Sequence, residues 1–371
     1  MNDARARLRY LDRTIDLLFP GPGEARPYTL LPHRLLPRRL VPRAWWHPGG
    51  RIMVRSGRDG IESHLSEVFG TRLRVTLRVS PARRANRKPI LEARAPDGPI
   101  AFVKIGDTDL TRELVAHEAR TLGLLAGVPL KTVVPPAVLH HGSWRGLSVL
   151  ALTPLPVRRG RIRDDVLTAA IAEIARIPAP PPPPPVPVPV PVPVPDQASF
   201  GDPPHRLAGP DGATSEEEAA TASFAEGSAE GATVASAAGL ADTRPLERSH
   251  GEDFAWHGDL TPWNISRGPD GRLLVWDWER FGTGVPLGFD AVHHFFHRAL
   301  RRQDPVTAAG ACVARALRIL APFGLSAAES RLTAVRYLIA LADRHAADGH
   351  TPLGPPEAWL DPVVDGQEAL L

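Results

Sequence analysis

The sequence predicts an α+β protein in which most strands precede residue 153 and most helices follow residue 165. Apolar and polar residues alternate from Arg72 to Val79, the period expected of a strand with one buried face. Two further apolar runs, at 90–94 and 100–105, come after segments that favour loops and turns. After residue 288 the apolar residues recur at helical spacing instead. This pattern favours an antiparallel sheet followed by a mainly helical region.

Residues 1–61 are expected to form an N-terminal extension. Leu8, Leu11 and Ile15 fall on one face of a predicted helix. The run 32–43 is rich in arginine, leucine and proline. Because proline prevents the amphipathic helix that membrane-surface binding usually needs, we expect an extended segment whose leucines pack on the next domain. An anion or membrane-surface contact is the alternative.

Residues 62–152 are expected to form one domain, an antiparallel five-stranded sheet plus a helix. The helix carries an apolar stripe that begins near residue 110, with Asp109 or Thr111 as its cap. Segment 153–157 contains two prolines and would be a hinge to a second domain, 158–371. The predicted strands are 72–79, 90–94, 100–105, 133–139 and 146–152.

Lys104 lies on the same predicted strand face as Ile100 and Phe102. An ammonium group on an apolar face carries a large desolvation cost unless a carboxylate pairs with it. Glu118 lies inside the apolar stripe of the following helix, so we expect Lys104 to pair with Glu118. Glu113 is the alternative, but it points about 140° away from Glu118 at 100° per residue.

The composition narrows the class of protein. Lys and Arg total 44 against 41 Asp and Glu, a net charge of +3, which argues against nucleic-acid binding by bulk charge. A single cysteine, Cys312, excludes a disulfide framework. No apolar signal segment opens the sequence, and no stretch is long and apolar enough to span a bilayer. We therefore expect a cytoplasmic protein with no membrane span.

A helix predicted at 166–177 is followed by a segment of unusual composition. Residues 178–195 are almost entirely proline and valine, and 196–245 are mostly small or acidic. Such residues cannot bury enough apolar surface to offset the entropy of ordering, so 178–245 is expected to be a disordered insertion in the second domain. One interpretation is that this segment binds a proline-recognising protein partner. We favour the other, that it is a low-complexity expansion that the fold tolerates.

The segment 257–277 carries the clearest chemical motif. Asp259 could accept a proton from a hydroxyl, while Asn264 and Asp277 offer the hard oxygen ligands that Mg²⁺ prefers. A Gly- and Pro-containing turn at 267–272 predicts a hairpin that would bring Asn264 and Asp277 together. Phosphoryl transfer needs this combination of a base, positioning groups and metal ligands.

These residues resemble the aminoglycoside phosphotransferase and choline kinase family, small-molecule kinases with a two-lobed protein-kinase-like fold. His257, Asp259, Asn264 and Asp277 match the family motif at its spacing. The resemblance covers about 62–177 and 246–371, and implies ATP as phosphoryl donor, with GTP also compatible, and Mg²⁺ as cofactor. It implies Asp259 as the base, His257 as a brace of the loop, and a small-molecule hydroxyl as acceptor. The implied nucleotide- and metal-binding residues are Lys104, Glu118, Asn264 and Asp277, with Glu279 as a further metal ligand.

Two alternatives stay open. A protein kinase is disfavoured by Gly258, where protein kinases usually carry arginine, and by Asp277-Trp278-Glu279 in place of Asp-Phe-Gly. A non-catalytic nucleotide-binding scaffold using the Pro-rich arm is disfavoured because it has no chemical need of both metal ligands and a base. The role of the glycine-free loop 80–89 also stays open. Its basic residues either contact the phosphates of the nucleotide or are exposed to solvent. These are Arg83, Arg84, Arg87 and Lys88.

Helices are predicted at 291–302, 306–320 and 327–346. Asp290 is expected to cap the first, and the resemblance implies that it also braces the catalytic loop. His293, His294 and His297 have metal-ligand spacing, but no carboxylate or cysteine is expected to complete the set, so packed or exposed histidines are favoured over zinc. In this family such helices form the acceptor pocket, and its candidate lining residues are Arg331, Arg336, Asp343, Arg344 and His345.

Overall fold

The computed structural model describes residues 2–33, 36–47, 50–79, 86–158, 160–179, 254–349 and 351–365. The chain divides into two compact units, Met1–Pro181 with Gly251–Leu371, and Pro182–His250. All described residues belong to the first unit. The insertion expected at 178–245 lies outside the described residues from residue 180 onward, as do Arg83 and Arg84.

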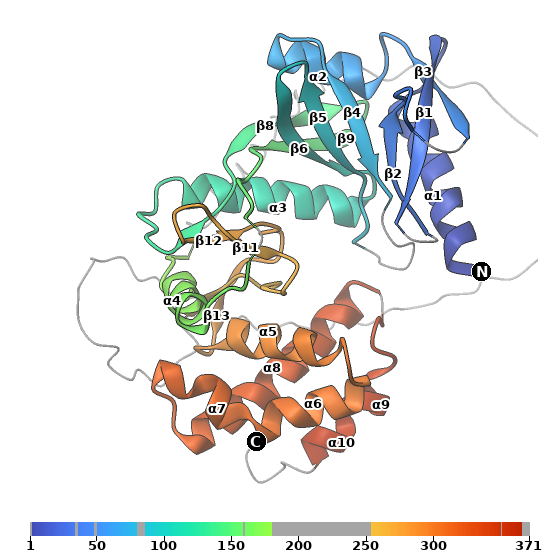
Figure 1. The fold of residues 1–371 in the computed structure, drawn as a ribbon. Helices are drawn as coiled ribbons and strands as arrows, with labels where there is room; N and C mark the ends of the chain where they lie inside the picture. The colour runs from blue at the N-terminus through green and yellow to red at the C-terminus, as the bar shows by residue number, and fades with distance from the viewer. Residues whose placement is uncertain are drawn as a thin grey trace, which may run out of the picture. The chain divides into compact units, whose positions relative to one another are not determined.

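The dominant element is an eight-stranded sheet in which every neighbouring pair is antiparallel. Its spatial order is β3-β1-β2-β4-β5-β6-β9-β8 (Figure 1). The strands are β1 (Glu24–His33), β2 (Leu36–Pro42), β3 (Arg51–Ser56), β4 (Arg74–Arg78), β5 (Ile90–Ala95), β6 (Gly98–Gly106), β8 (Val138–Trp144) and β9 (Leu147–Leu152).

The expectation of five strands is therefore wrong, because residues 24–56 extend the sheet by three. Leu40 of β2 pairs with Leu77 of β4, and both side chains are buried in one cluster with Tyr28 and Val54. Burying these apolar groups makes the N-terminal strands part of the sheet's own core. Prolines and arginines within 24–56 obscure the alternation that would have revealed the strands.

The fourth predicted strand, 133–139, is also placed differently. β7 (Val133–Val134) leaves the large sheet and pairs in parallel with β12 (Leu273–Val275). Pro135 and Pro136 follow directly, and proline has no N–H to donate to a ladder. The large sheet resumes only at Val138, with β8.

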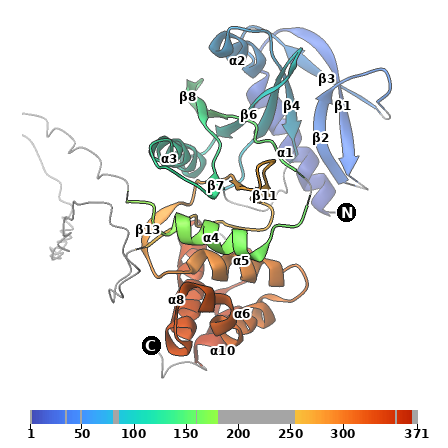
Figure 2. The same cartoon turned by 60° about the vertical axis from the view of Figure 1, so that its left-hand side comes forward.

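Three helices accompany the sheet. α1 (Asn2–Leu18) is the predicted N-terminal helix, whereas α2 (Ile61–Phe69) was expected as part of the strand region. α3 (Asp109–Leu125) lies along β6, β8 and β9 (Figures 1 and 2). The cap of α3 is Thr108 and neither predicted residue, because Thr108 and Thr111 each accept a hydrogen bond from the other's backbone N–H.

The second half of the described chain is mainly helical, and its core also includes Val115, Leu122 and Leu125 of α3 and Leu150 and Leu152 of β9. α4 (Asp164–Ile174) and α8 (Ala327–Ala347) both contact α5 (Phe289–Ala299) (Figure 2). The helix predicted at 306–320 is broken into α6 (Pro305–Ala314) and α7 (Ala316–Leu320). Short elements complete this half: β10 (Phe254–Trp256), β11 (Ile265–Arg267), β13 (Gly282–Val285), the 3-10 turn Ala321–Phe323, α9 (Pro356–Trp359) and α10 (Asp361–Val364).

No single helix in the described ranges has the length and apolarity to cross a membrane. Together, Pro305–Ala314 and Ala316–Phe323 reach that length and apolarity, but they are bent by 67°. Residues 153–157, the predicted hinge, carry no regular secondary structure between β9 and α4. Thr153 N donates to Ala137 O at 3.0 Å, so this segment is tied back to the start of β8.

Candidate active site

The β11–β12 hairpin brings Asn264 and Asp277 to the same end of one short ladder. Ile265 pairs with Val275, and Trp276 N donates to Asn264 O at 3.1 Å. The turn predicted at 267–272 closes this hairpin, with Gly268 N donating to Arg272 O at 2.8 Å. Residues separated by 13 positions in the sequence thus come together through local hydrogen bonds.

Asp277 leaves the hairpin in a left-handed conformation, with φ = 74°. Aspartate visits this region more readily than most residues with a side chain, at a modest cost. The turn lets the Asp277 carboxylate face Lys104 while Trp278 N donates to Glu118 Oε1 at 3.2 Å. The same turn therefore links β12 to both β6 and α3.

Lys104 is the centre of a buried ionic cluster. Its Nζ lies 2.7 and 2.6 Å from the two carboxylate oxygens of Glu118, and 2.6 Å from Asp277 Oδ1. Glu118 is fully buried, whereas Glu113 is exposed on the opposite side of α3. The structure thus forms the Lys104–Glu118 pair and not the Glu113 alternative.

Lys104 and Asp277 stabilise each other's charge, whereas burial raises the pKa of Glu118. Burial alone would lower the pKa of Lys104, but Asp277, Glu118 and Glu279 outweigh it and raise the pKa above its ordinary value. Burial acts to raise the pKa of Asp277, but Lys104 and Lys88 hold it well below its usual range. At neutral pH the ammonium of Lys104 and the carboxylate of Asp277 are therefore both charged.

Glu279 belongs to the same cluster through the loop between β4 and β5. It forms an ion pair with Lys88, and Asn86 Nδ2 donates to its Oε1 at 3.4 Å. Lys88 and Glu279 are both nearly fully buried. Lys88 is therefore not a solvated lysine. Sequence reasoning missed the pairing because the two residues are 191 positions apart.

The cluster fits a divalent cation by its chemistry. Oxygen atoms of Glu118, Asp277 and Glu279 lie within 4.8 Å of one another. These three carboxyl groups outnumber the two ammonium groups, of Lys88 and Lys104, that contact them. Carboxylate oxygens are hard ligands suited to Mg²⁺.

Asp259 is held from two sides. Asn264 Nδ2 donates to Asp259 Oδ2 at 2.8 Å and to its backbone O at 3.0 Å. On the other side, His293 Nε2 lies 3.1 Å from Asp259 Oδ1, and Tyr337 OH lies 3.0 Å from His293 Nδ1. Burial raises the pKa of Asp259, and the nearby Asp277 adds to that shift. A raised pKa makes the carboxylate a better proton acceptor.

The loop before Asp259 is fixed by its backbone. Asp290 accepts hydrogen bonds from His257 N at 2.7 Å and Gly258 N at 3.3 Å. Gly258 has φ = 79°, and a Cβ there would lie 2.0 Å from Arg280 O, so only glycine fits. Asp290 does not cap α5 as expected, because the N-cap is Gly288 and Asp290 lies in the first turn.

His257 is fully buried against Trp278, with ring centroids 4.6 Å apart. Its Nδ1 accepts a hydrogen bond from Asp259 N at 3.1 Å. Burial lowers the pKa of His257 to about 4, so the ring is neutral at physiological pH. The ring therefore contacts the loop backbone on one side and the Asp277-Trp278 segment on the other.

The expectation that no carboxylate completes the histidine set is wrong. Asp259, His293 and His297 place ligand atoms within 4.8 Å of one another, although Asp259 comes from a different loop. His294 points elsewhere, with Nδ1 3.0 Å from Leu260 O. Sequence spacing within α5 could not show this contact, because the carboxylate lies 34 positions before His293.

A cleft of about 290 Å³ opens beside Asp259. Of the residues proposed to line an acceptor pocket, Arg344 and His345 line this cleft, whereas Arg331, Arg336 and Asp343 do not. His297, singled out above for its spacing, also lines the cleft. The other lining residues were not singled out by sequence reasoning: Asn86, Trp263, Arg280, Leu300, Arg301, Asp348, Pro352 and Leu353.

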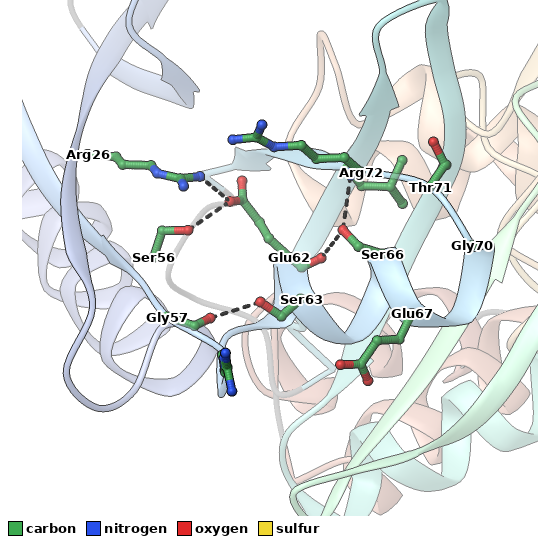
Figure 3. Close-up of a pocket in the computed structure, with 12 residues that line it drawn as sticks. Arg26, Ser56, Gly57, Glu62, Ser63, Ser66, Glu67, Gly70, Thr71 and Arg72 are labelled. Atoms are coloured by element: carbon green, nitrogen blue, oxygen red, sulfur yellow. Dashed lines mark hydrogen bonds and ion pairs between the residues drawn. The ribbon is translucent and has the colours of Figure 1, made fainter.

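A second cavity lies between β1, β3 and α2 (Figure 3). Its buried carboxylate, Glu62, accepts hydrogen bonds from Tyr28 OH at 2.6 Å, Val75 N at 3.0 Å and Ser56 Oγ at 3.4 Å. Arg26 reaches the same carboxylate from the side, at 4.0 Å. Glu62 therefore ties α2 to β1, β3 and β4, and this cavity shares no lining residue with the cleft at Asp259.

Comparison with known proteins does not identify a family for this chain. No protein-family model and no curated protein sequence matches the chain. One solved structure, described as "Putative fructosamine-3-kinase" from Haemophilus somnus 129PT, is similar at 12% sequence identity and a TM-score of 0.45. The match covers 82% of this chain and 96% of that one. A likeness at this level identifies neither a family nor a substrate.

Proposed function

We propose that this protein transfers the γ-phosphoryl group of ATP to a hydroxyl group of a small molecule. The observation that supports this most is the convergence of Lys104, Glu118 and Asp277 from three separate elements. Asp259 and Asn264 lie one short loop away, beside a cleft of small-molecule size. On this proposal the sheet with α3 and the helical half are the two lobes of a kinase-like fold, joined by a hinge at 153–157.

Each residue has a chemical role in the proposed reaction. Lys104, aimed by Glu118, contacts the α- and β-phosphates of the nucleotide. Asp259 orients the acceptor hydroxyl and takes its proton as the hydroxyl oxygen bonds to the γ-phosphorus. The bond from the γ-phosphorus to the bridging oxygen breaks, leaving a phosphate ester and ADP. His257 braces the loop that carries Asp259.

Asn264 and Asp277 would hold Mg²⁺, with Glu279 as a further ligand. When bound, Mg²⁺ would neutralise negative charge on the phosphate oxygens. Asn264 uses its amide nitrogen on Asp259, which leaves its amide oxygen for a cation. The candidate acceptors are a sugar, an amino alcohol and an aminoglycoside-like molecule, and the charge of the cleft bears on the choice among them.

The proposal is tested with the full chain and two active-site variants. Nucleotide binding is measured by calorimetric titration of Mg-ATP and Mg-GTP, and transfer by ADP release over a panel of sugars, amino alcohols and aminoglycosides. Asp259→Asn should lower transfer by roughly 10²–10⁴-fold while leaving nucleotide affinity within a few-fold. Asp277→Ala should also lose Mg²⁺-dependent nucleotide binding.

Asp343→Asn is the matched control, because Asp343 is exposed on α8 and does not line the cleft. It should behave as wild type in both measurements. If both single variants, Asp259→Asn and Asp277→Ala, turned over like wild type, the active site would lie elsewhere in the protein. Nucleotide binding without transfer to any acceptor would favour a binding protein instead.

A further inference from the structure

The walls of the cleft beside Asp259 carry an excess of cationic groups. Three arginines line it, from separate parts of the chain: Arg280 before β13, Arg301 after α5 and Arg344 on α8. The acidic residues that line it are Asp259 and Asp348. His297 and His345 also line the cleft and can add positive charge when protonated.

The two carboxylates of the cleft are already engaged. Asp348 forms an ion pair with Arg280. Asp259 is bound by Asn264 and His293, and on the proposed function it must keep an oxygen for the acceptor hydroxyl. Within the described ranges, neither Arg301 nor Arg344 forms an ion pair with a carboxylate. Arg301 and Arg344 therefore reach the cleft without a directly paired carboxylate, although the charges of Asp259 and Asp348 act on Arg344.

Arg344 is held in a fixed orientation. One of its terminal nitrogens donates to Gly258 O, and its guanidinium carbon lies 5.5 Å from the centre of the Trp256 ring. Burial lowers the pKa of Arg344 and the positive charge of Arg280 adds to that shift, while Tyr337, Asp259 and Asp348 oppose it. An anion in the cleft would stabilise the charge of this buried guanidinium group. An arginine that is already positioned also loses little side-chain entropy when it binds one.

We propose that the acceptor of this enzyme is an anionic small molecule, carrying a phosphate or a carboxylate group in addition to the hydroxyl that is phosphorylated. This inference rests on the proposed function. The hydroxyl lies at Asp259, and the anionic group is bound by Arg344 and Arg301. Arginine presents paired N–H donors that match the oxygens of phosphate or carboxylate. A cationic acceptor such as an aminoglycoside would instead meet unbalanced positive charge.

The test measures binding first. Glycerol 3-phosphate, glycerate, glycerol and ethanolamine are titrated calorimetrically, at fixed ionic strength, into protein saturated with Mg²⁺ and a non-hydrolysable ATP analogue. We expect one or both anionic probes to bind at least about tenfold more tightly than glycerol, and ethanolamine not to exceed glycerol. The comparison of glycerol 3-phosphate with glycerate distinguishes a phosphate from a carboxylate site.

Arg301→Gln should remove most of the preference for the anionic probe without changing glycerol binding. Arg302→Gln is the matched control, because Arg302 is the adjacent arginine, is exposed like Arg301, and does not line the cleft. Arg344→Gln, accepted only if its melting temperature stays near wild type, should have the same effect as Arg301→Gln. Equal affinity for charged and neutral probes, or an anion preference unchanged in Arg301→Gln, would overturn the proposal.

Transfer assays with the same four molecules separate the two levels of inference. If the anionic probes bind in an arginine-dependent way but no acceptor is phosphorylated, the result supports the anion site. It counts against the proposed kinase function. Phosphorylation of ethanolamine or glycerol with a higher kcat/KM than either anionic molecule would keep the kinase activity and refute the anionic acceptor.

Discussion

His293 Nε2 lies 3.1 Å from Asp259 Oδ1, and Tyr337 OH lies 3.0 Å from the other ring nitrogen of His293. Burial lowers the pKa of His293 well below its ordinary value, so the ring is neutral. Tyr337 can then donate to Nδ1 while the Nε2–H of His293 donates to the Asp259 carboxylate. This buried chain fixes the carboxylate from the side opposite Asn264.

We predict that His293→Leu lowers kcat by roughly tenfold to hundredfold, since a hydrogen bond to a charged group contributes about 1.5–3 kcal/mol. The KM for ATP should stay within about twofold, because His293 does not touch the nucleotide-binding residues in this structure. His293→Gln retains an N–H donor and should recover part of the loss. Loss of ATP affinity in step with kcat, with no recovery in glutamine, would indicate a merely structural role.

A second prediction concerns the buried Lys104–Glu118 pair. In a double-mutant cycle, Lys104→Met and Glu118→Gln should each weaken nucleotide binding, and the double variant should be little worse than either. The expected coupling free energy is about 2 kcal/mol, because each side chain acts through the other. Glu113→Gln, on the exposed face of α3, is the control and should bind nucleotide normally. Two additive losses would show that the residues act independently.

The stability of the protein should fall in mild acid. Burial lowers the pKa of His294 to about 4, whereas an unfolded histidine titrates near 6.5. The unfolded state therefore takes up the proton first, and stability is lost as pH falls from about 6.5 to 4. For His294 alone the full shift corresponds to roughly 3 kcal/mol. Neutral His294 is favoured because burial penalises the charged ring, and this effect outweighs the contact with Leu260 O, which acts to raise the pKa.

His294→Asn isolates this contribution, because an asparagine amide can still donate to Leu260 O. The free energy of unfolding is measured in urea at pH 7 and pH 4.5 for both proteins. The variant should lose less stability between the two pH values than wild type does. Burial also lowers the pKa of His257 and His293 and raises the pKa of Asp290. Because these three residues are present in both proteins, their contributions cancel in the comparison. Equal losses would contradict the assignment.

A fourth prediction follows from the residues on either side of the Pro-rich segment. Ala255 N donates to Ala175 O at 3.1 Å, so the chain before and after the segment is joined directly. Replacing residues 182–250 with about eight Gly and Ser residues should keep a cooperative melt and leave stability equal or higher, by up to roughly 2 kcal/mol. Loss of cooperative melting would show that the replaced residues contribute to the core.

The sequence by itself determined the local features of the site. The α+β class, the β11–β12 hairpin and the Lys104–Glu118 pair all follow from short-range patterns: alternation, turn residues, and a charged residue inside an apolar stripe. These patterns operate within one or two elements, where backbone geometry dictates which side chains share a face. The meeting of Asn264 and Asp277 was predictable for the same reason, because one hairpin joins them.

Tertiary structure alone decided the contacts between distant elements. Lys88 meets Glu279, and His293 meets Asp259, only because loops and helices far apart in the sequence pack together. The three extra strands were hidden because proline and arginine interrupt their alternation, while burial of Leu40 with its neighbours still stabilises them. Which cations face the cleft beside Asp259 was decided in the same way. The arginines that line it come from three separate parts of the chain, and no spacing along the chain encodes their meeting.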